Sequence, residues 1–217
     1  MARLETNQGP VVLKWFGWRH PIHFYLSPLR TSRAWRSWKT ATTLENAGAR
    51  TPHPLFIFSR RHRGFIRENY FITIAIHPHQ KLRTFLKTDT PADVMASAVG
   101  DLAVSIARMH EGGIIHRDLT SGNFLVDEGG RVYLVDLNRA QPIKHISTRQ
   151  RLTDLARISF TSRDQDLTTL LARKFFQVYS VETDQTIDWE RRYWTYRHRR
   201  LRRRRWKQRL RQLFHRK

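Results

Sequence analysis

Two short apolar runs near the middle of the chain predict a β-hairpin. Residues 124–126 and 132–135 are apolar and partly β-branched, and the turn between them contains Gly129 and Gly130. Apolar runs divided by a glycine-containing turn are typical of paired antiparallel strands. Because both ends of a hairpin lie at the same edge, the side chains just before and just after it are predicted to lie close together.

Residues 32–47 have the periodicity of an amphipathic helix. Ser32 is placed to accept a hydrogen bond from the first turn, and Gly48 is placed to end the helix. The apolar residues of this segment fall on one face: Ala34, Trp38, Ala41 and Leu44. We therefore predict a helix that packs behind the strand expected at residues 11–16.

Residues 90–112 predict a longer helix, which we expect to be buried at the centre of the molecule. Thr90 is the predicted N-cap, Pro91 the first helical residue, and Gly112 ends the pattern. Apolar residues recur through it at helical spacing: Met95, Ala98, Leu102, Ile106 and Met109. Residues 152–158 and 165–179 predict two further helices.

Strands are predicted mainly in the first third of the chain. The apolar runs there are residues 11–16, 55–58, 64–66 and 70–76. The basic segment 59–63 is predicted as a solvated hairpin tip, with a binding role as the alternative. A small sheet followed by a mainly helical part predicts the α+β fold class.

The composition is that of a folded domain with one unusual property, its charge. Hydrophobic residues make up 40% of the 217, and no cysteine is present, which excludes disulfides and thiolate metal sites. His77 and His79 lack a third ligand nearby, so a surface loop is favoured there over a zinc site. The net charge is +22, and residues 191–217 contain 14 lysines and arginines but no acid. Such an excess predicts an anionic partner: nucleic acid, membrane headgroups or a phosphorylated glycolipid.

The end of the chain, residues 189–217, is predicted to form a basic helix with an apolar stripe. Trp206, Leu210, Leu213 and Phe214 fall on one face, which is typical of a helix that lies in a membrane interface. An arm that binds nucleic acid and a plain solvated tail are the two alternatives. The first ten residues lack the apolar core of a signal peptide, and no run of about 18 apolar residues predicts a membrane span.

Polar residues with a meaningful spacing surround the predicted hairpin. His116, Arg117 and Asp118 precede it, Asn123 stands at its entrance and Asp136 at its exit. In phosphoryl transfer a carboxylate orients the attacking hydroxyl and takes its proton, while an Asp and an Asn hold the magnesium that bridges the nucleotide phosphates. Mg²⁺ needs few protein oxygens, because it also binds phosphates and water. We therefore predict Asp118 as the catalytic base and Asn123 and Asp136 as metal ligands, with a surface hairpin carrying incidental acids as the alternative.

The same spacing resembles the H-R-D-L-x-x-x-N signature of eukaryotic-like kinases, with Asp136 as the second metal-binding acid. Lys14, in the strand at residues 11–16, resembles the kinase lysine that contacts the α- and β-phosphates of ATP, although an ordinary edge-strand lysine fits as well. Only ten residues precede that strand, and Gly9 is the single glycine among them. The Gly-rich loop that covers the phosphates is therefore missing: either the natural start lies upstream or the small lobe is reduced.

The family that the chain resembles most is the lipopolysaccharide kinase group. Its members are similar in the blocks matched here by residues 116–125 and 134–140, and in a helix block matched by residues 36–38. The resemblance implies a two-lobed protein-kinase-like fold. A truncated N-lobe sheet would occupy residues 1–80 and a mainly helical C-lobe residues 81–188, followed by the basic tail.

The resemblance also implies an activity. The group phosphorylates Kdo or heptose in the inner core of lipopolysaccharide, so it implies an ATP- and Mg²⁺-dependent phosphotransferase acting on an anionic glycolipid, a lipid A–core precursor. Such an enzyme would be cytoplasmic and peripheral on the inner membrane. His116 and Arg117 would brace the catalytic loop through packing and ion pairing, and the backbone of residues 75–78 would meet adenine. Asp154, in a D-L-A-R block, would brace the same loop, or is a plain first-turn helix acid.

Some positions depart from the kinase pattern. Thr120 and Asn138 replace the Lys and Gly of protein kinases, and no A-P-E follows Asp136, which argues against a peptide substrate. Ser37 stands where the Glu that pairs with the strand lysine is expected, and Glu45 lies two turns further on. A pseudokinase or scaffold module and an atypical protein or RNA-associated kinase are therefore the alternative functions, and nucleic acid as a partner is disfavoured but open.

Overall fold

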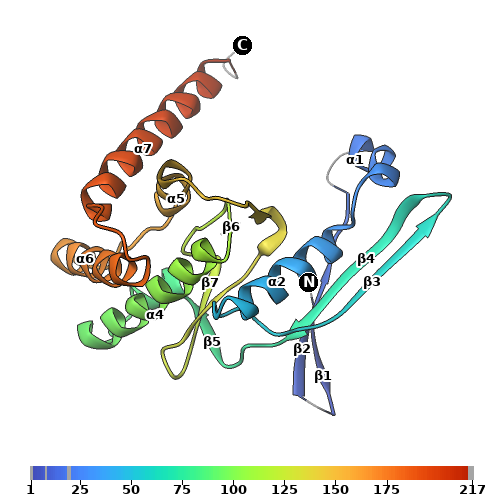
Figure 1. Ribbon diagram of the computed structural model, residues 1–217, viewed down its shortest axis with the longest axis horizontal. Helices are drawn as coiled ribbons and strands as arrows, with labels where there is room; N and C mark the ends of the chain where they lie inside the picture. Colours follow the sequence, from blue (N-terminus) through green and yellow to red (C-terminus); the bar gives the residue numbers. More distant parts are fainter. Residues whose placement is uncertain (1, 8, 19–20, 215–217) are drawn as a thin grey trace.

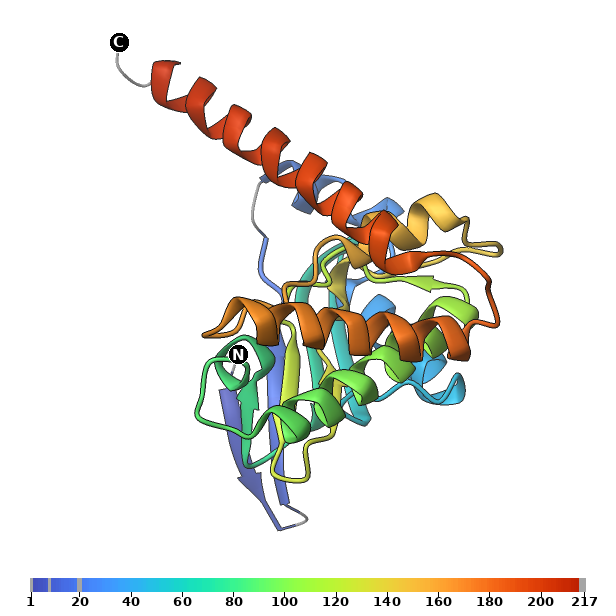
Figure 2. The same ribbon diagram turned by 90° about the vertical axis from the view of Figure 1, so that its left-hand side faces the viewer.

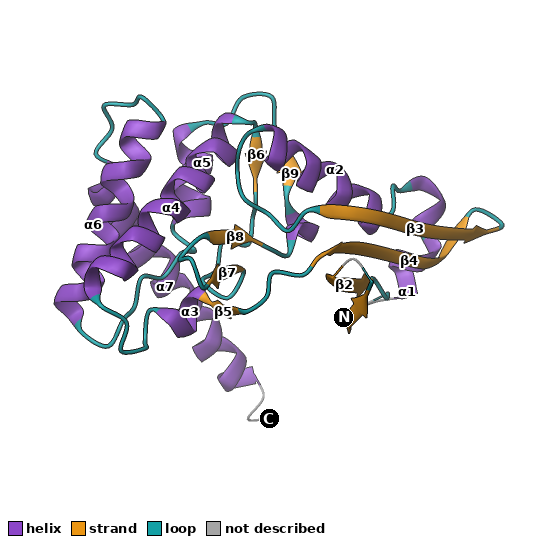
Figure 3. Cartoon of the chain, turned by 90° about the horizontal axis from the view of Figure 1, so that it is seen from below, coloured by secondary structure: helices purple, strands orange, loops and turns teal. Residues whose placement is uncertain are grey.

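The four-stranded N-terminal sheet lies on one side of the molecule together with the helices of residues 21–46, and most of the other helices lie on the opposite side (Figures 1 and 3). The computed structural model describes residues 2–7, 9–18 and 21–214, without the side chains of residues 21, 23, 207 and 209–214. The N-terminal elements are β1 (Ala2–Thr6), β2 (Gly9–Trp15), α1 (Pro21–Tyr25), η1 (Ser27–Leu29), α2 (Arg33–Asn46), β3 (Pro54–His62) and β4 (Phe65–Ile74). The later elements are β5 (His79–Lys81), α3 (Leu82–Phe85), α4 (Ala92–Glu111), β6 (Ile114–Ile115), β7 (Phe124–Asp127), β8 (Val132–Leu134), η2 (Leu137–Arg139), β9 (Gln141–Pro142), α5 (Thr148–Leu155), α6 (Gln165–Glu182) and α7 (Trp189–Phe214).

The N-terminal sheet has the strand order β1-β2-β4-β3, and all neighbouring strands are antiparallel. β2 confirms the strand predicted around Lys14, which lies opposite Phe71 of β4. β1 pairs with β2 at the outer edge of the sheet, from Ala2 opposite Leu13 to Thr6 opposite Gly9. The sheet therefore holds Lys14 on an inner strand.

α2 packs against the sheet and confirms the helix predicted there. Ser32 caps it, because its side chain accepts a hydrogen bond from the Trp35 amide at 3.1 Å. Ala34, Ala41 and Leu44 of the predicted apolar face have no exposed surface. The helix begins and ends where the sequence indicated, since capping and periodicity agree.

The hairpin formed by β3 and β4 is longer than predicted. The segment 59–62 belongs to β3, and the two runs predicted as separate strands at 64–66 and 70–76 form the single strand β4. An ion pair between Arg60 and Glu68 bridges the two strands and extends the pairing of this basic segment. The turn itself contains Arg63 and Gly64, both with positive φ.

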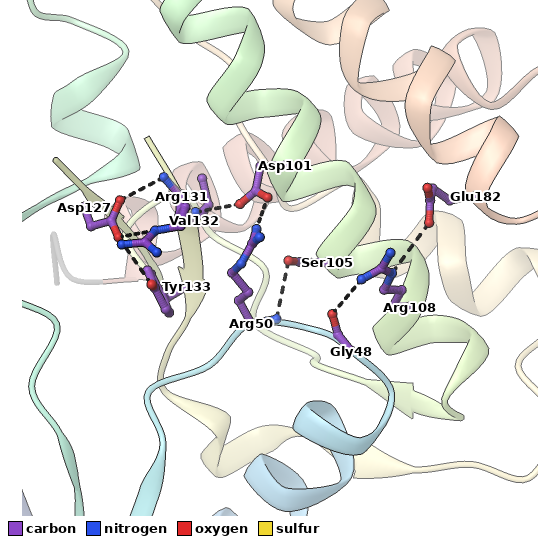
Figure 4. Close-up of polar contacts among 10 residues, drawn as sticks. All are labelled: Gly48, Arg50, Asp101, Ser105, Arg108, Asp127, Arg131, Val132, Tyr133 and Glu182. Carbon is purple, nitrogen blue, oxygen red and sulfur yellow. Dashed lines mark hydrogen bonds and ion pairs between the residues drawn. The ribbon is translucent and has the colours of Figure 1, made fainter. Parts of the chain in front are cut away.

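Polar contacts attach the segment after α2 to the central helix α4 (Figure 4). The Arg50 amide donates to Ser105 Oγ at 3.4 Å, and the Arg50 guanidinium pairs with Asp101. Asp101 also accepts the Val132 amide of β8 at 2.8 Å. The Arg50 carbonyl accepts the Leu134 amide at 2.8 Å. Helix α4 thereby joins the N-terminal part to the hairpin β7–β8.

α4 is the buried central helix that the sequence predicted, and α6 lies beside it (Figure 2). Its predicted core residues Met95, Leu102 and Met109 have no exposed surface. The predicted Thr90 cap is wrong: Pro91 is the N-cap and makes no side-chain hydrogen bond. Thr90 is instead within hydrogen-bond distance of Thr88, hydroxyl to hydroxyl at 2.8 Å.

The last helix, α7, confirms the predicted C-terminal helix and has two parts. Trp189 and Tyr193 are buried in the same core as α4 and α6. The remainder extends away from the body as a long rod (Figure 2). Trp206 of the predicted stripe is 63% exposed, and the side chains of Leu210, Leu213 and Phe214 lie outside the described residues. Among the residues that are described, no helix is long and apolar enough to cross a membrane.

Candidate active site

The predicted hairpin exists and brings its two ends together. β7 and β8 pair antiparallel with Phe124 opposite Leu134, and the Val135 amide donates to the Asn123 carbonyl at 2.9 Å. Asn123 and Asp136 therefore stand next to each other at the open end, as the spacing predicted. Asp136 has a left-handed backbone, with φ 62°, an uncommon conformation for a residue other than glycine that occurs often at functional sites.

Asp154 fixes the loop that precedes the hairpin. Its carboxylate, with 1% of the side chain exposed, accepts the His116 amide at 2.7 Å and the Arg117 amide at 2.8 Å. Arg117 has φ 64°, and two charge-assisted hydrogen bonds can hold such a strained turn. Asp154 lies in the last turn of α5, so the bracing role describes it and the first-turn alternative is wrong.

His116 links the loop to the hairpin. Its ring is buried, its Nε2 lies 3.2 Å from the Val135 carbonyl, and its Nδ1 accepts the Asp118 amide at 3.3 Å. Burial lowers the pKa of His116, against the opposing effect of Asp154. A neutral ring protonated at Nε2 satisfies both contacts. His116 therefore spaces Asp118 from the strand end that carries Asp136, consistent with the predicted packing role.

Arg117 acts through its backbone, which differs from the ion pair that we predicted. Its guanidinium forms no ion pair with any acid in the described part of the chain, and the residue is exposed. The contact of Arg117 with Asp154 is made by its amide, at a residue with a left-handed backbone, and the guanidinium takes no part in it.

Asp118 lies in the loop between His116 and the hairpin. Its carboxylate is 28% exposed, and its Oδ2 lies 3.7 Å from Arg139 Nη1. The Asp118 carbonyl accepts both the Thr120 amide at 2.7 Å and Asn123 Nδ2 at 2.8 Å. Asn123 thus holds the loop through Nδ2, and its side-chain oxygen Oδ1 takes no part in this contact. Asp118 is both accessible and positioned, as a catalytic base must be.

Lys14 reaches across from the sheet to the hairpin. Its Nζ lies 2.5 Å from Asp136 Oδ1, so residues 122 positions apart in the sequence meet at this site. Asn138 Nδ2 also donates to Asp136 Oδ1, and Ser37 Oγ donates to Asn138 Oδ1 at 3.4 Å. Glu45 pairs with His53 and not with Lys14. The lysine therefore has Asp136 as its acidic partner among the residues described.

The two predicted metal ligands retain oxygens for a cation. Asn123 uses Nδ2 and Asp136 uses Oδ1 in the contacts above, and within the described residues neither Asn123 Oδ1 nor Asp136 Oδ2 has a hydrogen-bond partner. One amide and one carboxylate oxygen at the same hairpin end fit Mg²⁺, which takes one or two protein oxygens together with phosphates. The donor set therefore fits a magnesium nucleotide.

The segment predicted to meet adenine has limited free backbone. The Ala75 amide donates to the Pro10 carbonyl at 2.9 Å, and Pro78 has no amide hydrogen. The amides of Ile76 and His77 are the donors that remain in this segment.

Sequence reasoning did not single out two arginines near Asp118. Arg139 contacts Asp118, and the charge of Asp118 also acts on Arg200 of α7. Arg139 lies inside the 134–140 block but matched no role, and Arg200 could not be told from the other basic residues around it. Only the folded chain distinguishes them.

Comparison with known proteins places this site in a family. The model of the Lipopolysaccharide kinase (Kdo/WaaP) family matches residues 16–179, which include Asp118, Asn123, Asp136 and Asp154, whereas Lys14 precedes the match. The chain resembles 3-deoxy-D-manno-octulosonic acid kinase of Vibrio vulnificus (strain CMCP6), with 24% identity over 138 residues, which are 64% of this chain and 57% of that protein. The enzyme of the same name from Vibrio parahaemolyticus serotype O3:K6 is 24% identical over 57% of this chain and 50% of its own length.

A solved structure has the same fold. A structure described as WaaP in complex with acyl carrier protein matches with a TM-score of 0.61 and 23% identity, over 82% of this chain and 72% of that one. The match confirms the kinase-like α+β fold. The chain spans little more than half the length of the curated relatives that it matches. On the family match, which covers most of its length, this chain is a member of the lipopolysaccharide kinase (Kdo/WaaP) family.

Proposed function

We propose that the protein is an ATP-dependent kinase that phosphorylates a Kdo or heptose sugar of the lipopolysaccharide inner core. The observation that carries the proposal is the convergence of Lys14, Asp118, Asn123 and Asp136 on one rim, with the loop held by Asp154. These residue types are the ones that phosphoryl transfer to a hydroxyl requires. Family membership supports the kinase chemistry and the use of ATP.

Each residue has a task in the proposed reaction. Asp118 orients the sugar hydroxyl and accepts its proton, because its carboxylate is partly exposed and its loop is fixed. Lys14 binds the α- and β-phosphates once it moves from Asp136 to the nucleotide. Asn123 and Asp136 hold Mg²⁺, which neutralises charge on the phosphates when bound. Arg117 and His116 keep the loop in shape.

Transfer of labelled γ-phosphate from ATP to a Kdo-containing lipid A precursor tests this function. Asp118→Asn is expected to lower the rate by about two orders of magnitude or more, because it removes the base. Its melting temperature is expected to stay near that of the wild type, as is that of the matched exposed control Asp166→Asn, which should keep its activity. An equal loss of folding and activity in Asp118→Asn would show a structural aspartate instead.

A pseudokinase is the second candidate, and one contact favours it. Ser37 occupies the expected Glu position and contacts Asn138 in place of Lys14. The Lys–Glu pair that active protein kinases require is therefore missing. Magnesium-dependent ATP binding without transfer to any sugar of the inner core would support this candidate over the enzyme.

We further propose that the protein works peripherally at the cytoplasmic face of the inner membrane. The basic residues 191–217 and the exposed Trp206 support an anionic surface as partner, since each Lys or Arg near such a surface contributes about 1 kcal/mol. Retention on vesicles of phosphatidylglycerol, compared with retention on RNA at the same ionic strength, tests this partner. Preferential retention on RNA would favour a nucleic-acid-associated kinase.

A further inference from the structure

The base of α7 is attached to the predicted catalytic loop through Ile158 and Ser159. Tyr193 Oη donates to the Ile158 carbonyl at 2.9 Å, and Arg197 donates to the same carbonyl at 2.5 Å and to Ser159 Oγ at 2.9 Å. Ser159 in turn exchanges hydrogen bonds with Ser121, at 3.0 Å through its amide and at 2.6 Å through its carbonyl. Ser121 lies between Asp118 and Asn123 in the sequence. Short hydrogen bonds therefore fix α7 relative to the catalytic aspartate.

Helical spacing then places two more arginines on the same side as Arg197. Arg200 and Arg204 follow it by three and seven residues, which is one and two turns along one face. Burial, together with repulsion from Arg157 and Arg204, lowers the pKa of Arg200, and attraction to Asp118 offsets part of this effect. Arg157 and Arg204 thus lie near Arg200, which the charge of Asp118 also reaches, and we call Arg157, Arg200 and Arg204 the arginine cluster.

The arginine cluster has an excess of positive charge. Arg157 Nε is buried without a hydrogen bond, and its contact with Asp154 Oδ1 is long, at 3.9 Å. Neither Arg200 nor Arg204 forms an ion pair with an acid in the part of the chain that the structure describes. Asp154 is already committed to the loop amides. Like charges held together without a counter-ion repel each other, so the cluster favours an added anion.

The position of the cluster assigns that anion to the acceptor and not to ATP. Lys14 comes from β2 of the four-stranded sheet, whereas α7 packs against α5 and α6 in the helical part of the molecule (Figures 1 and 3). The cluster thus belongs to the helical part of the molecule, and an acceptor hydroxyl that attacks the γ-phosphate in line must enter from the side opposite the nucleotide. Arginine suits this task, because its planar fork binds phosphate or carboxylate through paired hydrogen bonds.

We propose that Arg157, Arg200 and Arg204 bind an anionic group of the acceptor, a phosphate or a carboxylate, and so place its hydroxyl at Asp118. This inference rests on the proposed kinase function and adds a requirement: the acceptor must carry a negative charge close to the reacting sugar. The cluster would be a specificity-determining subsite, distinct from the opposite side of α7, where helical spacing places Arg199 and Arg202.

Charge-matched pairs of variants in α7 test the subsite. Arg200→Gln and Arg204→Gln are expected to raise the KM for a Kdo-containing, phosphorylated lipid A precursor by about tenfold or more, as loss of a charge-assisted contact predicts. The neighbouring controls Arg199→Gln and Arg202→Gln remove the same charge from another side of the helix and should leave this KM near that of the wild type. The KM for ATP should stay near that of the wild type in all four variants. This measurement distinguishes an effect on the acceptor subsite from an effect on the nucleotide site.

The acceptor itself can be varied to identify the anion. Removal of the lipid A phosphates, or conversion of the Kdo carboxylate to an amide, should abolish the difference between Arg200→Gln and Arg199→Gln for whichever group the cluster binds. The proposal fails if a cluster variant and its control lower activity equally and the charge of the acceptor makes no difference to either. Equal weakening of binding to phosphatidylglycerol vesicles by the two variants would then identify α7 as a helix for anionic surfaces in general.

The subsite can be tested even if no sugar is phosphorylated. Equilibrium binding of the detergent-solubilised precursor, before and after phosphatase treatment, measures recognition without turnover. If no transfer occurs but Arg200→Gln binds the precursor more weakly than Arg199→Gln does, the proposed activity is wrong and the proposed subsite is supported. Equal binding by both variants would overturn the subsite whether or not transfer occurs.

Discussion

Replacement of Asp154 by Ala is expected to destabilise the fold and the catalytic loop together. The carboxylate accepts two amides, His116 at 2.7 Å and Arg117 at 2.8 Å, and is almost fully buried. A buried amide left without a partner costs about 1–3 kcal/mol, and hydrogen bonds to a charged group contribute about 1.5–3 kcal/mol. Arg117 is exposed, so water can replace part of its bond. We therefore expect a loss of about 2–5 kcal/mol in the free energy of unfolding.

The isosteric change Asp154→Asn refines this expectation. The amide oxygen can keep one of the two bonds, but Nδ2 then faces the other backbone N–H, donor against donor. We expect a smaller loss, about 1–3 kcal/mol. The phosphotransfer rate should fall in both variants, because Arg117 has a positive φ that the Asp154 bonds maintain and Asp118 follows it directly.

Urea unfolding followed by tryptophan fluorescence measures the first effect, and thermal melting should show a decrease of about 5–15 °C for the alanine variant in a chain of this size. The matched control is Asp164→Asn. Asp164 is an exposed N-cap of α6 that accepts the Leu167 amide at 2.9 Å, and asparagine caps a helix as well as aspartate. If Asp154→Asn lost no more stability than Asp164→Asn, the bracing role would be refuted.

Three further outcomes follow from the same structure. Lys14→Met should raise the KM for ATP by about tenfold or more through loss of a charge-assisted phosphate contact; an unchanged KM would leave Lys14 as a strand residue that only pairs with Asp136. Asp136→Asn should raise the Mg²⁺ concentration for half-maximal transfer by about tenfold or more, and an unaltered Mg²⁺ titration would exclude it as a ligand. Burial lowers the pKa of His110, against the attraction of Asp154, whose Oδ2 lies 3.7 Å from His110 Nε2. The buried neutral ring therefore contributes fully to stability above pH 6.5, and this contribution is lost as the pH falls from 6.5 to the lower folded pKa. His110→Gln should therefore reduce the pH dependence of unfolding free energy between pH 7.5 and 5.5, by up to about 1.4 kcal/mol per pH unit, and an identical slope in this variant would contradict the assignment.

The sequence predicted the parts of the site that depend on local spacing. Asn123 and Asp136 flank two apolar runs, and hairpin pairing alone brings them together. Ser32 and the periodic residues after it define α2 for the same reason, because capping and amphipathicity act within a few residues.

The sequence could not predict features that depend on tertiary contacts. The basic segment at 59–62 reads as a loop, but its pairing with β4, supported by the Arg60–Glu68 ion pair, keeps it extended. Pro91 replaces Thr90 as N-cap, since Thr90 bonds Thr88 instead. The position of Arg200 beside Asp118 depends on how α7 docks on Ile158 and Ser159, which no local pattern encodes.

Two of the departures from the kinase pattern, Ser37 and Asn138, contact each other. In protein kinases a Glu on the helix behind the sheet pairs with the strand lysine, and that pair links the helix to the phosphates. Here Ser37 stands at the position of that Glu, and its hydroxyl donates to Asn138 Oδ1 at 3.4 Å and not to Lys14. Asn138 donates in turn to Asp136, which a glycine at that position could not do. Helix α2 is therefore linked to the Asp136 carboxylate through a neutral side chain, while Lys14 binds the same carboxylate directly. Ser37 and Asn138 together replace a charged connection with an uncharged one, and among the residues described the acidic partner of Lys14 is Asp136.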